Sequence, residues 1–248
     1  MNRPSIMSII RTADTGTRPF LAMSDDSHLY WCKQLNNGHG PQSTINEVVC
    51  SVIGDSLGAP IAPWEILEVP EGLVGTKTPP SSLGATSVLD HLPVFGSRVV
   101  HSADIADSIR FEDNDDNYRR LPKLVAFWIL CNAKDLQVIY DMADDKRVYS
   151  IDHGMWFGSD ESVWELASVD HLYGQTEIAH PTRGMPPEHW EAAIEAVWRL
   201  DEDLVGKVLA AVPSEWNSDV QQIAELVHYC LNRRDYAEKR LRVEMARG

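Results

Sequence analysis

The sequence predicts an α+β fold, with a β-rich N-terminal part followed by a mostly helical C-terminal part. In the first third of the chain, short runs of β-branched and aromatic residues alternate with turn-forming residues. In the last third, apolar residues instead recur at helical spacing among charged residues. We expect residues 1–95 to form a small lobe of antiparallel strands with one helix, and residues 96–248 to form a larger, mainly helical lobe.

The composition narrows the classes of function. The 248 residues are 44% hydrophobic, enough for a core, and the formal charge of −15 argues against a binder of nucleic acid or of membrane surfaces. A nucleotide ligand stays compatible with this charge, because its site needs only one or two local cations.

The cysteines and the apolar runs bear on the compartment. The sequence has no CxxC pair, no signal-peptide pattern and no apolar run of about 18 residues. We therefore expect a cytoplasmic protein without a membrane span. The sequence does not determine its oligomeric state. Its cysteines would be buried free thiols, at Cys32, Cys50, Cys131 and Cys230.

Three strands are predicted at residues 5–11, 18–23 and 28–35, which form an antiparallel meander. Lys33 lies in the third, mostly apolar strand. Either it faces solvent, as most strand lysines do, or it points into a cleft towards phosphate.

A helix is predicted next, with Ser43 as its N-cap and Gly58 after its last residue. Glu47 falls in the first turn of this helix. It either offsets the helix dipole or forms an ion pair that holds Lys33 in place.

The middle of the chain alternates loop, strand and helix signals. The helix expected at residues 117–131 is strongly apolar and is entered through Pro122. The other segments are, in order, a strand at 61–69, a loop at 70–85, a strand at 92–100, an acid-rich solvated surface at 104–116 and a strand at 136–140.

A second short strand, residues 148–151, leads into Asp152, His153 and Gly154. We expect Gly154 to take a positive φ and turn the backbone away, leaving the Asp152 carboxylate at a fixed point. The residue is either the cap of a turn or a ligand that holds Mg²⁺ against the phosphates of a nucleotide. His153 is interpreted as a packing or hydrogen-bonding residue.

The helical spacing of apolar residues in the last third of the chain predicts a helical lobe. We expect a loop at residues 179–184 and read the trio Arg233, Arg234 and Asp235 as a solvated face. The helices are expected at 187–200, 201–212 and 220–247.

Two stretches resemble the HipA-like kinase family, which has a protein-kinase-like fold of two lobes. One is the pattern K-x-x-N-N-x-x-G-x-x-x-x-x-N-E that ends in Asn46 and Glu47, and the other is the I-D-H-G wording around Asp152. The resemblance implies that the ligands are ATP and Mg²⁺. It implies that Lys33 contacts the phosphates, Glu47 pairs with Lys33, and Asp152 binds the metal.

The catalytic loop of that family has the form N-x-D-x-x-x-x-N, and this chain departs from it. Aligned from Asn132, the pattern puts Lys134 at the aspartate and Ile139 at the last asparagine. Aligned from the following strand, it puts Asp135 at the last asparagine and Leu130 at the aspartate. Asp135 is therefore our candidate for the catalytic base or for a second metal ligand.

Two functions compete, and a third, phosphoryl transfer to a small molecule, shares the cleft and is not separated from them by the sequence. The resemblance implies phosphoryl transfer from ATP to a serine or threonine of a protein. The altered loop favours a pseudokinase or binding module that docks a protein partner, whereas Lys33, Glu47 and Asp152 favour the enzyme.

Overall fold

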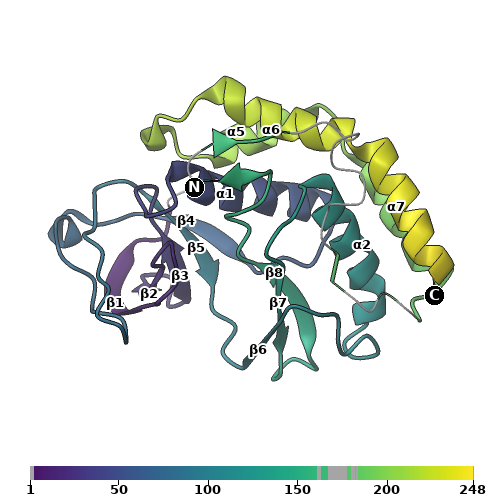
Figure 1. The fold of residues 1–248 in the computed structure, drawn as a ribbon. Coiled ribbons are helices and arrows are strands. Elements are labelled where there is room, and N and C mark those ends of the chain that lie inside the picture. The colour runs from purple at the N-terminus through teal and green to yellow at the C-terminus, as the bar shows by residue number, and fades with distance from the viewer. Residues whose placement is uncertain (1–2, 161–162, 167–177, 180–181, 183, 248) are drawn as a thin grey trace.

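The predicted α+β arrangement is confirmed by a computed structural model, which describes residues 3–160, 163–166, 178–179, 182 and 184–247 (Figure 1). A β-sheet region at the N-terminus is followed by helices that gather along the opposite side of the molecule (Figure 1). The loop expected at residues 179–184 lies largely outside the described residues. The division into lobes at residue 95 stays a prediction.

The N-terminal sheet has five antiparallel strands in the order β1-β2-β3-β5-β4. The predicted meander is present as β1, β2 and β3, and β5 inserts between β3 and β4. The register places Lys33 opposite Phe95. The strands are β1 (Ile6–Thr12), β2 (Phe20–Ser24), β3 (Leu29–Lys33), β4 (Trp64–Leu67) and β5 (Val94–Arg98).

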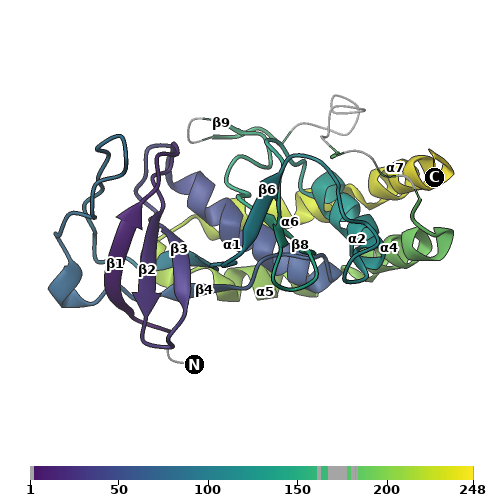
Figure 2. The same ribbon diagram turned by 90° about the horizontal axis from the view of Figure 1, so that it is seen from below.

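A second sheet, of three antiparallel strands, comes from the middle of the chain (Figures 1 and 2). Its strands are β6 (Ala103–Ala106), β7 (Gln137–Asp141) and β8 (Arg147–Ile151). The prediction that residues 104–116 form only a solvated surface is therefore wrong, because β6 pairs with β7, and Ala106 and Ile109 are buried. Two further short strands pair with each other, β9 (Ser159–Asp160) and β10 (Val163–Trp164).

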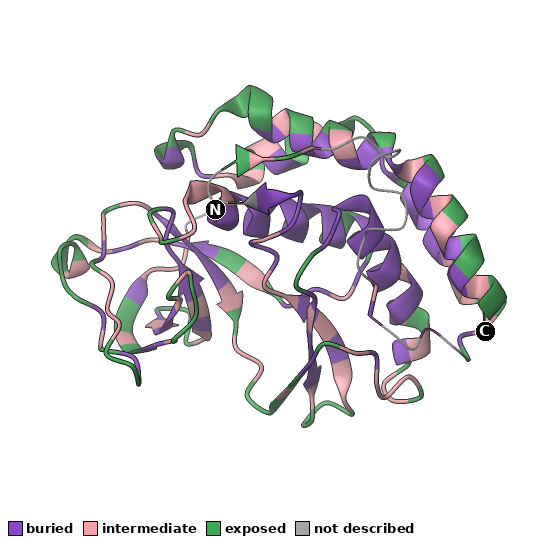
Figure 3. Cartoon of the chain, viewed as in Figure 1, coloured by how far each residue is buried: buried purple, intermediate pink, exposed green. Residues whose placement is uncertain are grey.

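Helix α1 (Pro41–Leu57) runs through the middle of the molecule and is buried on nearly all sides (Figure 3). It packs against β5 on one side and against α2, α4, α5 and α6 on the others. The N-cap is Gly40 and not Ser43, whose hydroxyl donates a hydrogen bond back to the Gly40 carbonyl at 2.8 Å. Glu47 consequently lies in the second turn and not in the first.

The other helices cover α1 and the second sheet. Pro122 lies inside α2 and not at its entrance, because the helix begins at Asn117. The single helix predicted at 220–247 is two helices that meet at Arg233. The helices are α2 (Asn117–Leu130), α4 (Pro187–Arg199), α5 (Asp203–Ala211), α6 (Val220–Asn232) and α7 (Arg234–Arg247), with short 3₁₀ turns at Glu71–Leu73 and Ser214–Trp216.

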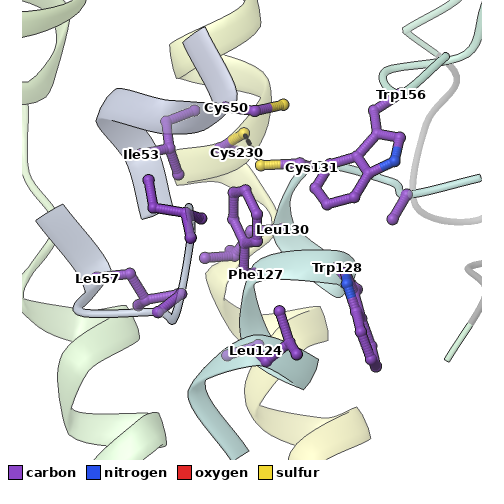
Figure 4. Close-up of a cluster of buried hydrophobic side chains, with 14 of the residues drawn as sticks. Cys50, Ile53, Leu57, Leu124, Phe127, Trp128, Leu130, Cys131, Trp156 and Cys230 are labelled. Atoms are coloured by element: carbon purple, nitrogen blue, oxygen red, sulfur yellow. Dashed lines mark hydrogen bonds between the residues drawn. The ribbon is translucent and has the colours of Figure 1, made fainter. Parts of the chain in front are cut away.

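The main hydrophobic core joins α1 to the C-terminal helices. Figure 4 shows the sulfur atoms of Cys50, Cys131 and Cys230 close together, with Phe127 beside them. The cysteines are buried and free, as predicted, and burial raises the pKa values of the Cys131 and Cys230 thiols. Within the described residues, no helix is both long and apolar enough to cross a membrane.

Candidate functional site

Lys33, Glu47 and Asp152 come together at the junction of the two sheets. The Lys33 Nζ lies 2.5 Å from Glu47 Oε1 and 2.6 Å from Asp152 Oδ1. Lys33 comes from the end of β3, Glu47 from α1, and Asp152 from the residue after β8. Three segments far apart in the sequence therefore place one ammonium group between two carboxylates.

Burial makes these contacts stronger than surface ion pairs. The Lys33 and Glu47 side chains are 9% and 2% exposed. Burial alone disfavours the charged form of Lys33, but the charges of Asp152 and Glu47 outweigh it and raise the Lys33 pKa. Burial also opposes the charged form of Glu47, yet the charge of Lys33 and the His153 side chain, whose Nδ1 lies 3.3 Å from Glu47 Oε2, lower the Glu47 pKa to about 2. The pair is therefore ionised at neutral pH.

The backbone after β8 turns at Asp152, which has a φ of 58°. The prediction that Gly154 carries the positive φ is wrong; aspartate tolerates this left-handed conformation better than most residues do. Gly154 is needed for a different reason, because a Cβ there would lie 3.2 Å from the carbonyl oxygen of Ser43 on α1. The missing side chain lets the segment after β8 lie directly against α1.

Asn46 ties the same segment to α1, a role that the sequence analysis did not assign. Its side-chain amide donates to the carbonyls of Gly154 and Trp156 at 2.9 and 3.1 Å, and to the Ser159 hydroxyl at 3.0 Å. Its amide oxygen accepts from the Trp164 indole at 2.8 Å. Adjacent residues of one helix thus act together, because Asn46 fixes the segment and Glu47 fixes the lysine.

His153 packs inside the site, as predicted. Its Nε2 lies 3.1 Å from the Ser150 hydroxyl, and its ring contacts Phe127 and Trp156. Its backbone N–H donates to Glu47 Oε2 at 3.2 Å. Each oxygen of the Glu47 carboxylate therefore has a partner, Oε1 in Lys33 and Oε2 in the backbone of His153.

A pocket opens beside the cluster, between the five-stranded sheet and the β6–β8 sheet. Lys33, Glu47 and Asp152 form its charged end. The rest of the wall is mainly apolar and includes Trp31, Phe95, Ile105, Ile139 and Ile151. The cavity encloses about 200 Å³. An apolar wall next to a charged end is suited to a ligand with an aromatic ring and a charged tail.

The turn between β1 and β2 closes over this pocket, with Ala13, Thr15 and Pro19 in its lining. Gly16 lies so close to the ring of His39 that a Cβ there would collide with it. The His39 Nδ1 is in turn 3.4 Å from the sulfur of Met155, in the segment after Asp152. The turn therefore packs down on the loop before α1 and does not form a glycine-rich cradle.

Asp135 is exposed and lies apart from this cluster. It lines a neighbouring hollow of about 480 Å³, together with Asp107, Ser108 and Arg110. Gln137 lies between the two, because it lines the same hollow and its amide nitrogen is 3.5 Å from Asp152 Oδ2. Sequence reasoning missed Gln137, since only the register of β7 and β8 shows that it neighbours Asp152.

No cluster of three or more histidine, cysteine, aspartate or glutamate side chains that could hold a metal ion occurs in the described part of the chain. A metal bound at Asp152 would therefore need ligands from amides, water or the phosphates themselves, as Mg²⁺ in nucleotide sites usually does.

Comparisons with known proteins agree with this geometry. A model of the HipA-like kinase family matches residues 6–242. The fold is similar to the crystal structure of a Helicobacter pylori proinflammatory kinase, CtkA, with a TM-score of 0.56, 12% identity and 96% of each chain covered. No curated protein sequence matches.

Two crystal structures of the Golgi casein kinase, one with Mn/ADP bound, are more distant, at 11% and 13% identity with TM-scores of 0.44 and 0.46. The matches cover 99% of this chain and 71% and 73% of those chains. With a protein-kinase-like fold and a family match over most of its length, the chain belongs to the HipA-like kinase family.

Proposed function

We propose that the protein binds ATP with a divalent metal ion in the pocket beside Lys33, and that it transfers the terminal phosphoryl group to a serine or threonine hydroxyl of a protein. One observation carries the proposal: a buried lysine fixed between a helix glutamate and an aspartate that follows a strand. In protein kinases, a lysine and glutamate pair of this kind positions the phosphates, and an aspartate holds the metal.

The residues of the pocket fit these ligands. The cluster contains two carboxylates and one ammonium group, so it has an excess negative charge that a cation would balance. Asp152 is the accessible carboxylate, with its side chain 37% exposed. Mg²⁺ prefers hard oxygen ligands such as this one and would neutralise charge on the phosphates.

The apolar wall fits the base of the nucleotide. The enclosed volume of about 200 Å³ admits a planar ring but is below the roughly 300 Å³ at which pockets begin to bury a whole ligand. The phosphates would therefore extend past Lys33 and Asp152 towards solvent, where an acceptor hydroxyl can approach.

A second candidate function is a pseudokinase that docks a protein partner without phosphoryl transfer. The position of Asp135 favours it, because this carboxylate is exposed in a neighbouring hollow and does not line the pocket with Asp152. Rapid transfer is helped by a carboxylate within reach of the acceptor hydroxyl.

A thermal-shift titration tests the proposal. With ATP and Mg²⁺ at 100 times the dissociation constant, the wild type should gain about 2.7 kcal/mol in its free energy of unfolding. Asp152→Ala should lose the Mg²⁺-dependent part of this gain, whereas Asp113→Asn, an exposed acid outside the pocket, should keep it. The proposal would be contradicted if ATP did not change the melting temperature of the wild type, either with or without Mg²⁺.

A further inference from the structure

The surroundings of Asp152 single out Gln137. Among the residues that the structure describes, two side chains hydrogen-bond the Asp152 carboxylate: Lys33 on Oδ1 and Gln137 on Oδ2. Gln137 is the first residue of β7, and the register places it opposite Ile151, which precedes Asp152. Its position next to Asp152 is thus set by the sheet and not by a loop.

The side chain of Gln137 can serve a metal ion. Its amide carries both a nitrogen donor and an oxygen acceptor, which exchange places when the group rotates by half a turn. In the structure the amide nitrogen lies 3.5 Å from Asp152 Oδ2, so the side chain already reaches this carboxylate. With a divalent cation at Asp152, the amide oxygen becomes the favoured end, because such cations take oxygen ligands.

This position also fixes the alignment of the catalytic loop. In protein kinases, the second metal ligand is an amide side chain five residues after the aspartate that accepts the hydroxyl proton. Five residues before Gln137 stands Asn132, which is 3% exposed. A neutral amide does not accept a proton as a carboxylate does. Neither alignment made from the sequence paired these two residues.

We infer that Gln137 is the second metal ligand beside Asp152, and that Asn132 occupies the position of the catalytic base, so that phosphoryl transfer proceeds slowly and without a carboxylate base. The inference rests on the proposed function. The acceptor oxygen forms a new bond to the γ-phosphorus, the bond from that phosphorus to its bridging oxygen breaks, and ADP leaves. The hydroxyl proton passes to water.

The first experiment measures the binding of ATP, with Mg²⁺ and with a chelator, by thermal shift and calorimetry. Gln137→Ala should weaken binding about tenfold in Mg²⁺ and leave binding in the chelator unchanged, and Gln137→Asn should retain part of the Mg²⁺ effect. Asp113→Asn changes an exposed carboxylate outside the pocket and should bind as the wild type does.

The second experiment measures conversion of ATP to ADP and autophosphorylation by intact mass. The wild type should be slow, Asp135→Asn should match it, and Asn132→Asp should be faster by about 10² or more. If Asn132→Asp does not fold, the wild-type rate and its ratio to the rate of Asp135→Asn decide whether the base position lacks a carboxylate. Rapid turnover by the wild type, or its loss in Asp135→Asn, would overturn the assignment of the base position.

The outcomes separate this inference from the proposed function. A wild type that binds no ATP overturns both. If the wild type binds ATP more tightly with Mg²⁺ and Gln137→Ala keeps this Mg²⁺ effect, only the assignment of Gln137 as a metal ligand is overturned. A folded Asn132→Asp variant without a faster rate overturns the assignment of Asn132.

Discussion

At the scale of single residues, the site depends on a carboxylate that remains ionised inside the protein. Glu47 is 2% exposed, and its pKa of about 2 reflects burial that is more than offset by Lys33 and His153. Since this pKa is lower in the folded than in the unfolded chain, the ionised form stabilises the fold. That stabilisation is fully present above pH 4.5 and is lost as the pH falls towards 2.

Replacement of Glu47 by glutamine should remove this pH dependence. Between pH 5 and pH 2.5, the wild type should lose on the order of 2 kcal/mol more of its free energy of unfolding than Glu47→Gln does. Urea denaturation at several pH values measures this difference. Glu195→Gln, an exposed change on α4, should follow the wild type; parallel pH curves for wild type and Glu47→Gln would contradict the expectation.

At the scale of elements, the junction of α6 and α7 holds the end of α2. Arg233 is 1% exposed, so the prediction of a solvated face is wrong at this residue. Its Nε and Nη2 donate to the carbonyl oxygen of Ile129 at 3.0 and 2.8 Å, and its guanidinium lies over the rings of Tyr229 and Tyr236. Ile129 precedes the loop that begins at Asn132, so the C-terminal helices fix the origin of that loop.

Loss of this side chain should therefore loosen the loop as well as the helix. Arg233→Met should lower the free energy of unfolding by about 2–4 kcal/mol, because it leaves a buried carbonyl without its charged donor. Hydrogen exchange should also rise at the amides of Asn132 and Ala133 more than in β2. Arg233→Lys should recover part of the loss, and Arg119→Met, on the exposed face of α2, should have neither effect. Unchanged exchange at the loop would restrict Arg233 to a packing role.

At the scale of the whole molecule, one core joins the parts that the sequence analysis divided. It contains Ile66 and Phe95 from the five-stranded sheet, Val48 from α1, and Leu204 and Leu226 from the C-terminal helices. A smaller cluster consists mainly of residues of the five-stranded sheet, joined by Val69 and Leu89. A substitution that destabilises the helical part should therefore also destabilise the sheet.

Leu204→Ala tests this coupling. Leu204 is 1% exposed on α5, and its truncation should cost about 2–5 kcal/mol. We expect melting followed by circular dichroism and by tryptophan fluorescence to shift to lower temperature together. Leu83→Ala, at a side chain that is 84% exposed, should melt as the wild type does. Two separate transitions would show that the sheet folds independently.

The features that could be predicted from the sequence are those that local residue patterns determine. Strands, the apolar helix faces and the order of Lys33, Glu47 and Asp152 follow from alternation, periodicity and motif wording. The sequence could not show that Arg233 is buried, because a charged residue reveals its partners only in three dimensions. The sequence did not predict Gln137 as a site residue for a similar reason. The pairing register, and not the spacing along the chain, makes it the neighbour of Asp152.

The central position of α1 limits how the molecule can move. Because the helix packs against β5, α2 and three C-terminal helices, a rigid-body closure of the two sheets would have to slide over a buried surface. The turn between β1 and β2 has less to displace, since it is held by the contact of Gly16 with the ring of His39 and by hydrogen bonds that Asp14 accepts from Ser82 and Leu83. If the proposed nucleotide binds, we expect this turn to move as a local flap, while the lysine and its glutamate keep their relative positions.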